Sequence, residues 1–265
     1  MEQLIKRLKE NGLLEIQTPV EKAAFVLRQF AEWFPFENTD VMNGIETDIS
    51  PEYLIQKMVL QKRGGLCYEI NPLLLLVLQE IGFDAKLGAG TIVNNGKWAL
   101  DQTHALVLLQ LDGKKYIADS GFGSHLALSP LKLDAEAVTS PAGTFRLRTH
   151  QTEKGSMVLE CLNEQNEWYI RYAFDWEPVP WRLLSDMKRA IHKNPLSPFN
   201  KELLIARVLQ DGTESINEKR QHRKWTDGRE ETIMFENEDK LIETVRRNFP
   251  SDLIKQVQNH LLFHD

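Results

Sequence analysis

The dipeptide Asp112-Gly113 constrains the fold of this chain more than any other short feature. It separates two runs rich in β-forming residues, at positions 103–111 and 114–119. An Asp-Gly pair between such runs favours a two-residue type I′ turn, which joins two antiparallel strands in a fixed register. The sequence therefore predicts a β-hairpin in which each residue has a defined partner across the turn.

This register brings two polar residues to one face of the hairpin. Counting outward from the turn, Leu106 faces Asp119, and His104 faces Gly121. Residues two apart on a strand share a face, so His104 and Asp119 become diagonal neighbours with backbones about 7–8 Å apart. A slip of one residue would separate them. From the pattern alone, the two side chains are equally consistent with an ordinary cross-strand pair and with part of a catalytic group.

Further strand patterns follow the same region of the chain. Segments at 86–93, 144–149, 156–162 and 167–174 are short, rich in β-formers and separated by polar turns such as Asn94-Asn95-Gly96. With the hairpin they make five or six successive antiparallel strands. Such a series predicts a sheet that closes into a barrel or packs as a sandwich.

The first third of the chain has a helical pattern. Thr18-Pro19 and Ser50-Pro51 each resemble a capping residue followed by proline at the first helical position. A bundle of about four helices is predicted before Gly82, which is a good helix terminator. Pro72 leaves one point open, because it cannot donate the backbone bond of a helix interior. Either the helix begins near Cys67 and bends, or it begins at Pro72 with Cys67 in the preceding turn.

Cys67 is a candidate nucleophile. It follows Gly64 and Gly65, which permit a sharp turn and close approach of a ligand. A cysteine at the beginning of a helix faces unpaired N–H groups and the positive end of the helix dipole, both of which favour the thiolate. The alternative is a buried structural cysteine at the end of a core helix. Cys161 lies within a predicted strand and is interpreted as a small core residue.

The final third combines helices and strands. A helix is predicted near residues 181–192, followed by a stiff, turn-rich connector at 194–199. Two hairpins are predicted, one at Asp211-Gly212 and one at Asp227-Gly228. Asn237 and Ser251 are expected to cap two terminal helices.

Composition limits the class of protein. The 265 residues carry a net charge of −6, with 42% hydrophobic and 26% charged residues, as in soluble globular proteins. The acidic balance argues against nucleic-acid binding, and the basic stretch at 219–224 is interpreted as a solvated face. No signal segment or membrane span is expected, and two cysteines imply no disulfide framework, so a cytoplasmic location is predicted. No metal-ligand motif is present, so no metal is expected.

Four segments together resemble the arylamine N-acetyltransferases. Residues 63–71, Arg-Gly-Gly-Leu-Cys-Tyr-Glu-Ile-Asn, are similar to that family's nucleophile motif, and residues 35–38, Pro-Phe-Glu-Asn, to its P-F-E-N segment. Residues 119–123, Asp-Ser-Gly-Phe-Gly, resemble its D-x-G-F-G motif, and residues 194–199 resemble a segment near its lid. Ser120 and Pro72 are the departures from the pattern, and neither is a triad position. The likeness covers most of the chain.

The resemblance implies an α+β fold in three parts. Residues 1–83 are expected to form a helical bundle that carries the nucleophile, residues 84–180 a central antiparallel β-barrel, and residues 181–265 a C-terminal α/β lid. In this arrangement, which is similar to that of cysteine proteinases, Cys67, His104 and Asp119 form a catalytic triad. Arg63, Glu69 and Asn71 are expected to brace the Cys67 loop, and an Arg63–Glu69 ion pair is a hypothesis.

The resemblance also implies the reaction. Acetyl-coenzyme A is the expected donor and an arylamine, arylhydroxylamine or hydrazine the expected acceptor, with an acetylated Cys67 between two half-reactions. Phe36 and Phe122 are expected to line the acceptor site, and Gly121 and Gly123 to let the coenzyme approach, unless they serve only as core and turn residues. No nucleic-acid or membrane partner is expected, and the oligomeric state is left open.

Two other classes are compatible with the same residues. A cysteine hydrolase or a transglutaminase-like enzyme would use the same triad with water or lysine as acceptor. A non-catalytic binding protein could keep the same fold. Binding alone does not require Cys67, His104 and Asp119 together, so their joint presence argues against this class.

Overall fold

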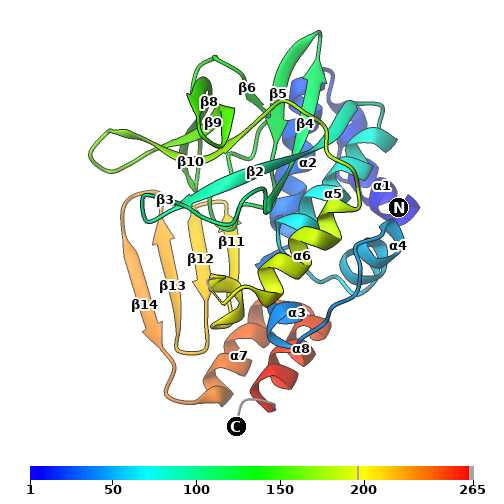
Figure 1. Ribbon diagram of the computed structural model, residues 1–265. Coiled ribbons are helices and arrows are strands. Elements are labelled where there is room, and N and C mark those ends of the chain that lie inside the picture. The colour runs from blue at the N-terminus through cyan, green and yellow to red at the C-terminus, as the bar shows by residue number, and fades with distance from the viewer. Residues whose placement is uncertain (196, 263–265) are drawn as a thin grey trace.

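The helices of the first part of the chain surround one long, buried helix. The computed structural model describes residues 1–195 and 197–262 (Figure 1). Leu196, within the predicted connector, lies outside these residues. The early helices are α1 Glu2–Glu10, α2 Pro19–Trp33, α3 Thr39–Met42, α4 Pro51–Leu54 with a π-helical continuation Ile55–Leu60, and α5 Cys67–Glu80. The predicted helical N-terminal region is confirmed, and the side chains of Thr18 and Ser50 cap α2 and α4.

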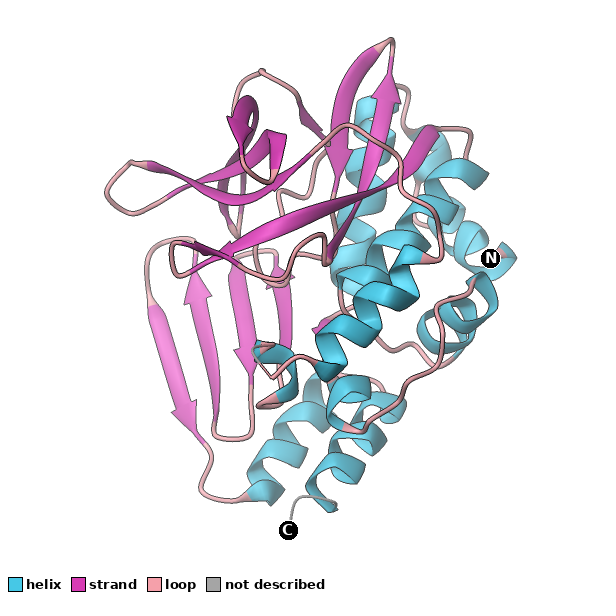
Figure 2. Cartoon of the chain, in the orientation of Figure 1, coloured by secondary structure: helices cyan, strands magenta, loops and turns pink. Residues whose placement is uncertain are grey.

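A nine-stranded antiparallel sheet follows in the chain (Figure 2). Its strands are β2 Asp84–Asn94, β3 Lys97–Trp98, β4 His104–Leu111, β5 Lys114–Ala118, β6 Leu131–Lys132, β7 Val138–Ser140, β8 Gly143–Thr152, β9 Gly155–Leu162 and β10 Trp168–Phe174. The order is β6-β5-β4-β2-β10-β9-β8-β7, with β3 beside β2. A bridge between Leu133 and Leu147 brings the two ends of this sheet together, so it forms a nearly closed barrel, as predicted.

The β4–β5 hairpin has the predicted register. Leu111 pairs with Lys114, and Val107 pairs with Ala118. Asp112 and Gly113 have φ of 48° and 72°, and a positive φ at both central residues is the requirement of a type I′ turn. The short-range prediction about this hairpin is therefore confirmed.

The last part of the chain builds a second, five-stranded sheet in the order β1-β11-β12-β13-β14. The strands of this sheet are β1 Phe36–Glu37, β11 Ile205–Leu209, β12 Gly212–Ile216, β13 Arg220–Trp225 and β14 Glu230–Met234. The same part of the chain contains the helices α6 Leu183–Lys193, α7 Glu238–Asn248 and α8 Ser251–Leu262 and a 3-10 turn Pro198–Asn200. The α+β class is confirmed. The division at residues 83 and 180 stays a prediction, and β1 joins this sheet although it precedes the barrel in the chain.

The C-terminal hairpins differ in detail from the prediction. Leu209 pairs with Gly212, so the first turn consists of Gln210 and Asp211 instead of Asp211-Gly212. A Cβ atom on Gly212 would lie 2.0 Å from the Lys224 carbonyl oxygen, so this glycine serves strand packing. The β12–β13 hairpin was not predicted. Asn237 caps α7 as expected, whereas Ser251 is the first residue of α8 and not its cap.

Strand β4 is buried on both faces and separates two cores. Ala105, Val107 and Leu109 point into the core shared with the N-terminal helices, which also contains Cys67. Leu106 and Leu108 point into the barrel interior, which also contains Cys161. This two-residue alternation is the expected geometry of a strand between two layers. A third, smaller core lies between the second sheet and helices α7 and α8.

Helix α5 resolves the question that Pro72 raised. The helix begins at Cys67 and includes Pro72 in its interior. Of the two predicted starting points Cys67 is therefore correct, and it occupies the first helical position. The helix ends at Glu80, and Gly82 follows with φ of 93°, as the glycine at that place predicts.

Candidate active site

Cys67 lies where α5 begins and meets the barrel. The backbone N–H of Leu66, the residue before the helix, donates to Glu69 Oε2 at 3.0 Å. Because leucine has no side-chain acceptor, only this half of a capping box is formed. Cys67 is 5% exposed. Its thiol donates to the carbonyl oxygen of Thr103, the residue before β4, with Sγ and O 3.5 Å apart. The thiol therefore sits directly beside the start of the predicted hairpin.

His104 and Asp119 form a direct, buried pair. Nε2 of His104 lies 2.7 Å from Oδ2 of Asp119. Burial by itself lowers the pKa of the imidazole, but the charge and hydrogen bond of Asp119, with a contribution from Cys67, raise that pKa to about 10. His104 is therefore the charged imidazolium at neutral pH.

The other ring nitrogen of His104, Nδ1, is the one that Asp119 does not contact. Nδ1 is buried and has no hydrogen-bond partner of good geometry, while Cys67 contributes to the raised pKa of the ring through both its charge and its proximity. The structure thus brings the thiol, the imidazole and the carboxylate of Cys67, His104 and Asp119 together in that order. This is the arrangement in which an imidazole exchanges a proton with a thiol and a carboxylate fixes the ring.

Three donors other than His104 fix the Asp119 carboxylate. Asn71 Nδ2 donates to Oδ1 at 2.8 Å, the backbone N–H of Gly121 donates to the same oxygen at 2.8 Å, and the Tyr172 hydroxyl donates to Oδ2 at 3.0 Å. Burial raises the pKa of this carboxyl, but His104, Asn71 and the Gly121 N–H outweigh it, and the pKa is lowered. Asp119 is therefore ionised and held in one orientation.

The glycines near Cys67 permit close contact between backbones. A Cβ atom on Gly121 would lie 2.7 Å from the Cα of Cys67, and one on Gly64 would lie 1.7 Å from the carbonyl oxygen of Pro35. A Cβ on Gly65 would lie 2.5 Å from Oε2 of Glu69. The space beside these three glycines is thus occupied by the protein itself. Gly123 differs, because its φ of 63° favours glycine in the turn that leaves the hairpin.

The two predicted pocket phenylalanines have different ring partners. Phe122 packs edge-to-face on the His104 ring, with centroids 5.1 Å apart, and also contacts Tyr172. Phe36 packs against Phe199 of the C-terminal region at 5.7 Å. Both residues are 7% exposed. The structure therefore places Phe122 against the catalytic candidates and Phe36 where β1 joins the second sheet.

A buried ionic cluster supports the loop before Cys67. Arg63 contacts Glu37 Oε1 at 2.9 Å and Asp40 Oδ1 at 2.6 Å. Lys57 contacts Asp40 Oδ2 at 2.9 Å and Glu69 Oε1 at 2.7 Å. The hypothesis of a direct Arg63–Glu69 pair is wrong, because Lys57 occupies the position beside Glu69 and Arg63 pairs with the P-F-E-N segment.

Sequence reasoning missed Tyr172 and Lys57. Tyr172 reaches Asp119 because β10 pairs with β2, a contact between strands far apart in the chain, and no local pattern announces it. Lys57 lies in an apolar run, where a lysine normally indicates the exposed face of a helix. Asn71 was expected to brace the Cys67 loop. Its side chain donates hydrogen bonds to Asp119 and to the Ala105 carbonyl oxygen, and it accepts one from the Ser120 N–H.

Within residues 1–195 and 197–262 no group of three or more His, Cys, Asp or Glu side chains is arranged to hold a metal ion. No described helix has the length and apolar character needed to cross a lipid bilayer.

Comparison with known sequences identifies related enzymes. The profile of an N-acetyltransferase family matches residues 21–257. The chain is 40% identical over 195 residues to the uncharacterized acetyltransferase YvcN of Bacillus subtilis, covering 73% of this chain and 76% of the relative. It is 35% identical over 181 residues to the arylamine N-acetyltransferase of Escherichia coli, covering 67% of this chain and 63% of that protein.

Solved structures agree over almost the whole fold. The arylamine N-acetyltransferase C of Bacillus anthracis superposes with a TM-score of 0.84 at 30% identity, covering 92% of this chain and 97% of that one. A Bacillus cereus arylamine N-acetyltransferase, described as having a unique Cys-His-Glu catalytic triad, gives 0.83 at 29% identity over 92% and 97% of the two chains. An arylamine N-acetyltransferase of Mycobacterium marinum, solved in complex with CoA, gives 0.78 at 25% identity over 88% of each chain. On the evidence of sequence and fold together, this chain belongs to the arylamine N-acetyltransferase family.

Proposed function

We propose that the protein transfers an acetyl group from acetyl-coenzyme A to an arylamine, arylhydroxylamine or hydrazine through an acetylated Cys67. One observation carries the proposal: the Cys67 thiol lies beside the His104 imidazole, whose Nε2 is 2.7 Å from Asp119. A non-catalytic binding protein has no need for this buried series of charges. The family to which the chain belongs supports the same chemistry, and the Mycobacterium marinum relative in complex with CoA supports the choice of donor.

In the first half-reaction the sulfur of Cys67 attacks the carbonyl carbon of the acetyl thioester. A new carbon–sulfur bond forms to Cys67, the bond to the sulfur of coenzyme A breaks, and the electron pair leaves with that sulfur. A pKa of about 10 keeps His104 charged at neutral pH, and an adjacent positive charge stabilises the thiolate of Cys67. The imidazolium is then available to give its proton to the departing sulfur.

In the second half-reaction the amine nitrogen attacks the acetyl carbon on Cys67. The nitrogen–carbon bond forms, the Cys67 thiolate leaves, and the amine proton passes to His104. Acetylation removes the negative charge of the thiolate, which is one of the causes of the raised pKa of His104. The loss of that charge lowers the pKa of the imidazolium, so after giving its proton to coenzyme A the ring stays neutral, and His104 is suited to act as a base at this stage.

The backbone at the start of α5 supplies donors for the developing oxyanion. The first N–H groups of a helix have no acceptor inside the helix, and Cys67 occupies the first helical position. We infer that the N–H groups of Cys67 and Tyr68 stabilise the negative oxygen of both tetrahedral intermediates. Such preorganised donors are worth about 3 kcal/mol each in comparable acyl-transfer sites.

An aromatic acceptor fits the side chains around the triad. Phe122 packs on the His104 ring, and Phe36 lies beside Gly123, with its ring 3.9 Å from the Cβ position of that glycine. An aromatic amine is a weak nucleophile, and a covalent thioester that stores activation next to apolar rings compensates for that weakness. Phe36 and Phe122 are the acceptor-site residues of this proposal. The turn at Gly121 and Gly123 is assigned to its donor side, where Gly121 also leaves room for the Cys67 backbone.

Mass spectrometry of the intact protein tests the proposal. The protein is mixed with acetyl-coenzyme A alone, and a mass increase of one acetyl group is expected on the wild type and on Cys161→Ala but not on Cys67→Ala. Addition of an arylamine should discharge the adduct much faster than water does. An unmodified wild-type protein with a free thiol would rule out acetyl transfer, and discharge by water at the same rate as by the amine would indicate a hydrolase.

A further inference from the structure

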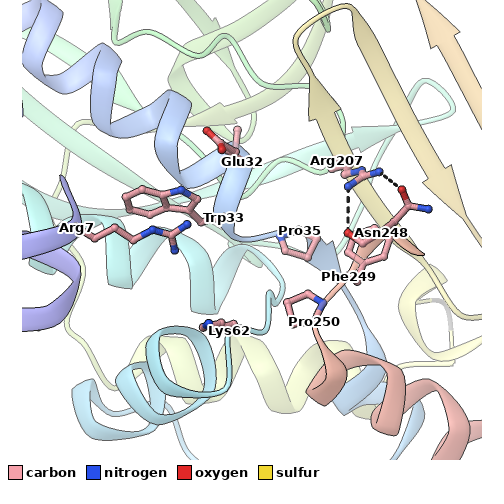
Figure 3. A pocket seen from close by; sticks show the side chains of 10 residues that line it. Arg7, Glu32, Trp33, Pro35, Lys62, Arg207, Asn248, Phe249 and Pro250 are labelled. Atoms are coloured by element: carbon pink, nitrogen blue, oxygen red, sulfur yellow. Dashed lines mark hydrogen bonds between the residues drawn. The ribbon is translucent and has the colours of Figure 1, made fainter. Parts of the chain in front are cut away.

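A cavity lies between the N-terminal helices and the C-terminal region, and its lining includes none of Cys67, His104 and Asp119. Its volume is about 250 Å³ (Figure 3). The lining comprises side chains from α1, α2, the turn before the Cys67 loop, β11 and the α7–α8 connection: Arg7, Ala31, Glu32, Trp33, Pro35, Lys62, Arg207, Asn248, Phe249 and Pro250. The cavity is smaller than the ~300–1,000 Å³ typical of sites for drug-sized ligands, so a fragment-sized molecule fits it best.

The two sides of the cavity are built alike from a cation stacked on an aromatic ring. The Arg7 guanidinium lies 3.7 Å from the centroid of the Trp33 ring, and that of Arg207 lies 4.7 Å from the centroid of Phe249. Figure 3 shows the first pair on one side and the second on the other, with Pro35 between them. Flat rings and fixed guanidinium groups make a surface suited to a flat, apolar body.

The charges of the cavity do not balance. Arg207 is neutralised by Glu214, at 2.7 Å, and its guanidinium also donates to Asn248 Oδ1 at 2.9 Å. In the described part of the chain, by contrast, neither Arg7 nor Lys62 has a carboxylate within ion-pair distance. The Glu32 carboxylate stabilises the charge of Arg7 only by a longer-range electrostatic interaction. Two cations and one carboxylate leave the cavity with a single uncompensated positive charge.

Lys62 is held at this place in an uncommon backbone conformation. Its φ is 55°, in the left-handed region that residues with a side chain rarely adopt. The next N–H, that of Arg63, donates to the Lys57 carbonyl oxygen at 3.1 Å and helps fix this turn. The turn therefore fixes the point on the backbone from which the Lys62 side chain reaches the cavity.

The cavity also touches the loop that carries Cys67. Pro35 lines it, and the Pro35 carbonyl oxygen accepts a hydrogen bond from the Gly65 N–H at 3.2 Å. Gly64 packs so closely on the same oxygen that a Cβ atom there would lie 1.7 Å away. A molecule bound against Pro35 and Lys62 would therefore contact two residues next to the Cys67 loop. Pro35 accepts a hydrogen bond from that loop, and Lys62 directly precedes it.

We propose that this cavity is a binding site for a small organic monoanion, a carboxylate carried on an aromatic or other flat apolar body. Arg7 and Lys62 pair with the carboxylate, and Trp33 and Phe249 cover the apolar body. Glu32 disfavours a second negative charge on the ligand. The site is separate from the transfer of acetyl groups and does not depend on that proposal.

Binding of 4-fluorobenzoate, followed by ¹⁹F NMR titration of the full-length protein, tests the site. Saturable binding is expected for the wild type, and the double variant Arg7→Gln/Lys62→Gln should bind about tenfold more weakly or worse, since charge-assisted hydrogen bonds are lost. The control Lys9→Gln/Lys97→Gln changes the charge equally but alters no residue that lines the cavity. It should bind as the wild type does.

Three results would overturn the proposal. One is a folded double variant that binds 4-fluorobenzoate like the wild type. Another is equal binding of the uncharged analogue 4-fluorobenzamide, which would show that the anion is not recognised. The third is complete displacement of the probe by an arylamine, which would place it near Cys67. If the double variant does not fold, the single change Lys62→Gln at this exposed residue is used instead and should weaken binding at least several-fold.

Discussion

The two cysteines of the chain are equally buried, each 5% exposed, yet they lie in opposite chemical surroundings. Cys67 begins a helix at the seam between the N-terminal core and the barrel, next to the charged pair of His104 and Asp119. Cys161 lies near the end of β9, between Phe145 on one neighbouring strand and Tyr169 on the other. Burial raises the pKa of the Cys161 thiol to about 12, and Arg171 offsets this only in part.

The comparison shows that partners, and not exposure, distinguish the proposed nucleophile from a core residue in this fold. Both thiols have lost nearly all their water, a loss that disfavours a thiolate in either place. Only Cys67 has an imidazolium beside it and lies at the beginning of a helix, where the positive end of the helix dipole is found. A search for reactive cysteines by accessibility alone would rank the two as equal.

Alkylation gives the largest expected difference between the two regions. At pH 7 iodoacetamide should modify Cys67 at least about a thousandfold faster than Cys161, because a thiol with a pKa of about 12 provides almost no thiolate. Peptide mapping after timed labelling measures both rates in one sample. Labelling of Cys161 as fast as Cys67 in the folded protein would end the distinction.

Removal of the Asp119 carboxylate should leave Cys67 without the charged pair beside it, and so in surroundings more like those of Cys161. Asp119→Asn is expected to lower kcat/KM for acetyl transfer by a factor between about 10² and 10⁴, because the imidazole loses its orientation and its charge partner. Asp119→Glu keeps a carboxylate and should lose less, consistent with the relative described as having a Cys-His-Glu triad. The control Asp84→Asn, on an exposed strand residue, removes the same charge and should leave kcat/KM within about twofold of the wild type. If the asparagine variant is as active as the glutamate variant, Asp119 has no such role.

The dependence of stability on pH should reveal the charged pair. The pKa of His104 is raised from about 6.5 to about 10 in the folded protein, so its stabilising contribution is complete below about pH 6.5 and is lost as the pH rises through about 10. Urea unfolding should show that the stability difference between wild type and Asp119→Asn shrinks by roughly 2–4 kcal/mol between pH 7 and pH 10.5. A difference that stays constant over this range would contradict a charged His104.

The smallest effect belongs to the core cysteine. Cys161→Ala removes one buried sulfur from an apolar environment and should lower the free energy of unfolding by about 1 kcal/mol, with kcat/KM unchanged. Cys67→Ala is the matched substitution at equal exposure, and it should abolish the reaction while altering stability little. Chemical denaturation and initial rates, measured on both variants, would expose any exchange of these roles.

Local chemistry explains which parts of the fold were predictable. The Asp112-Gly113 turn requires a positive φ at both positions, and few dipeptides meet that requirement, so the hairpin and its register follow from two residues. At Gly212 the same reasoning failed, because that glycine is required by the Lys224 carbonyl of the adjacent strand and not by a turn. A glycine needed for close packing looks identical in sequence to one needed for its φ.

Long-range contacts explain what the sequence left out of the site. The hairpin brought His104 and Asp119 to one face, but the position of Cys67 depends on how α5 packs on β4, which no spacing encodes. Tyr172 and Lys57 contribute through contacts with residues distant in the chain. The Arg63–Glu69 hypothesis failed for this reason, since each charge found a partner outside the local motif.

The order of strands has a consequence for the newly made chain. Cys67 leaves the ribosome first, and the strand that carries His104 and the loop that carries Asp119 follow later. The barrel that holds them cannot close before β10, which pairs with β2 and ends at Phe174, has been synthesised. The hydrogen bond from the Tyr172 hydroxyl to Asp119 therefore forms last, and the surroundings of Cys67 are complete only when β10 has been made.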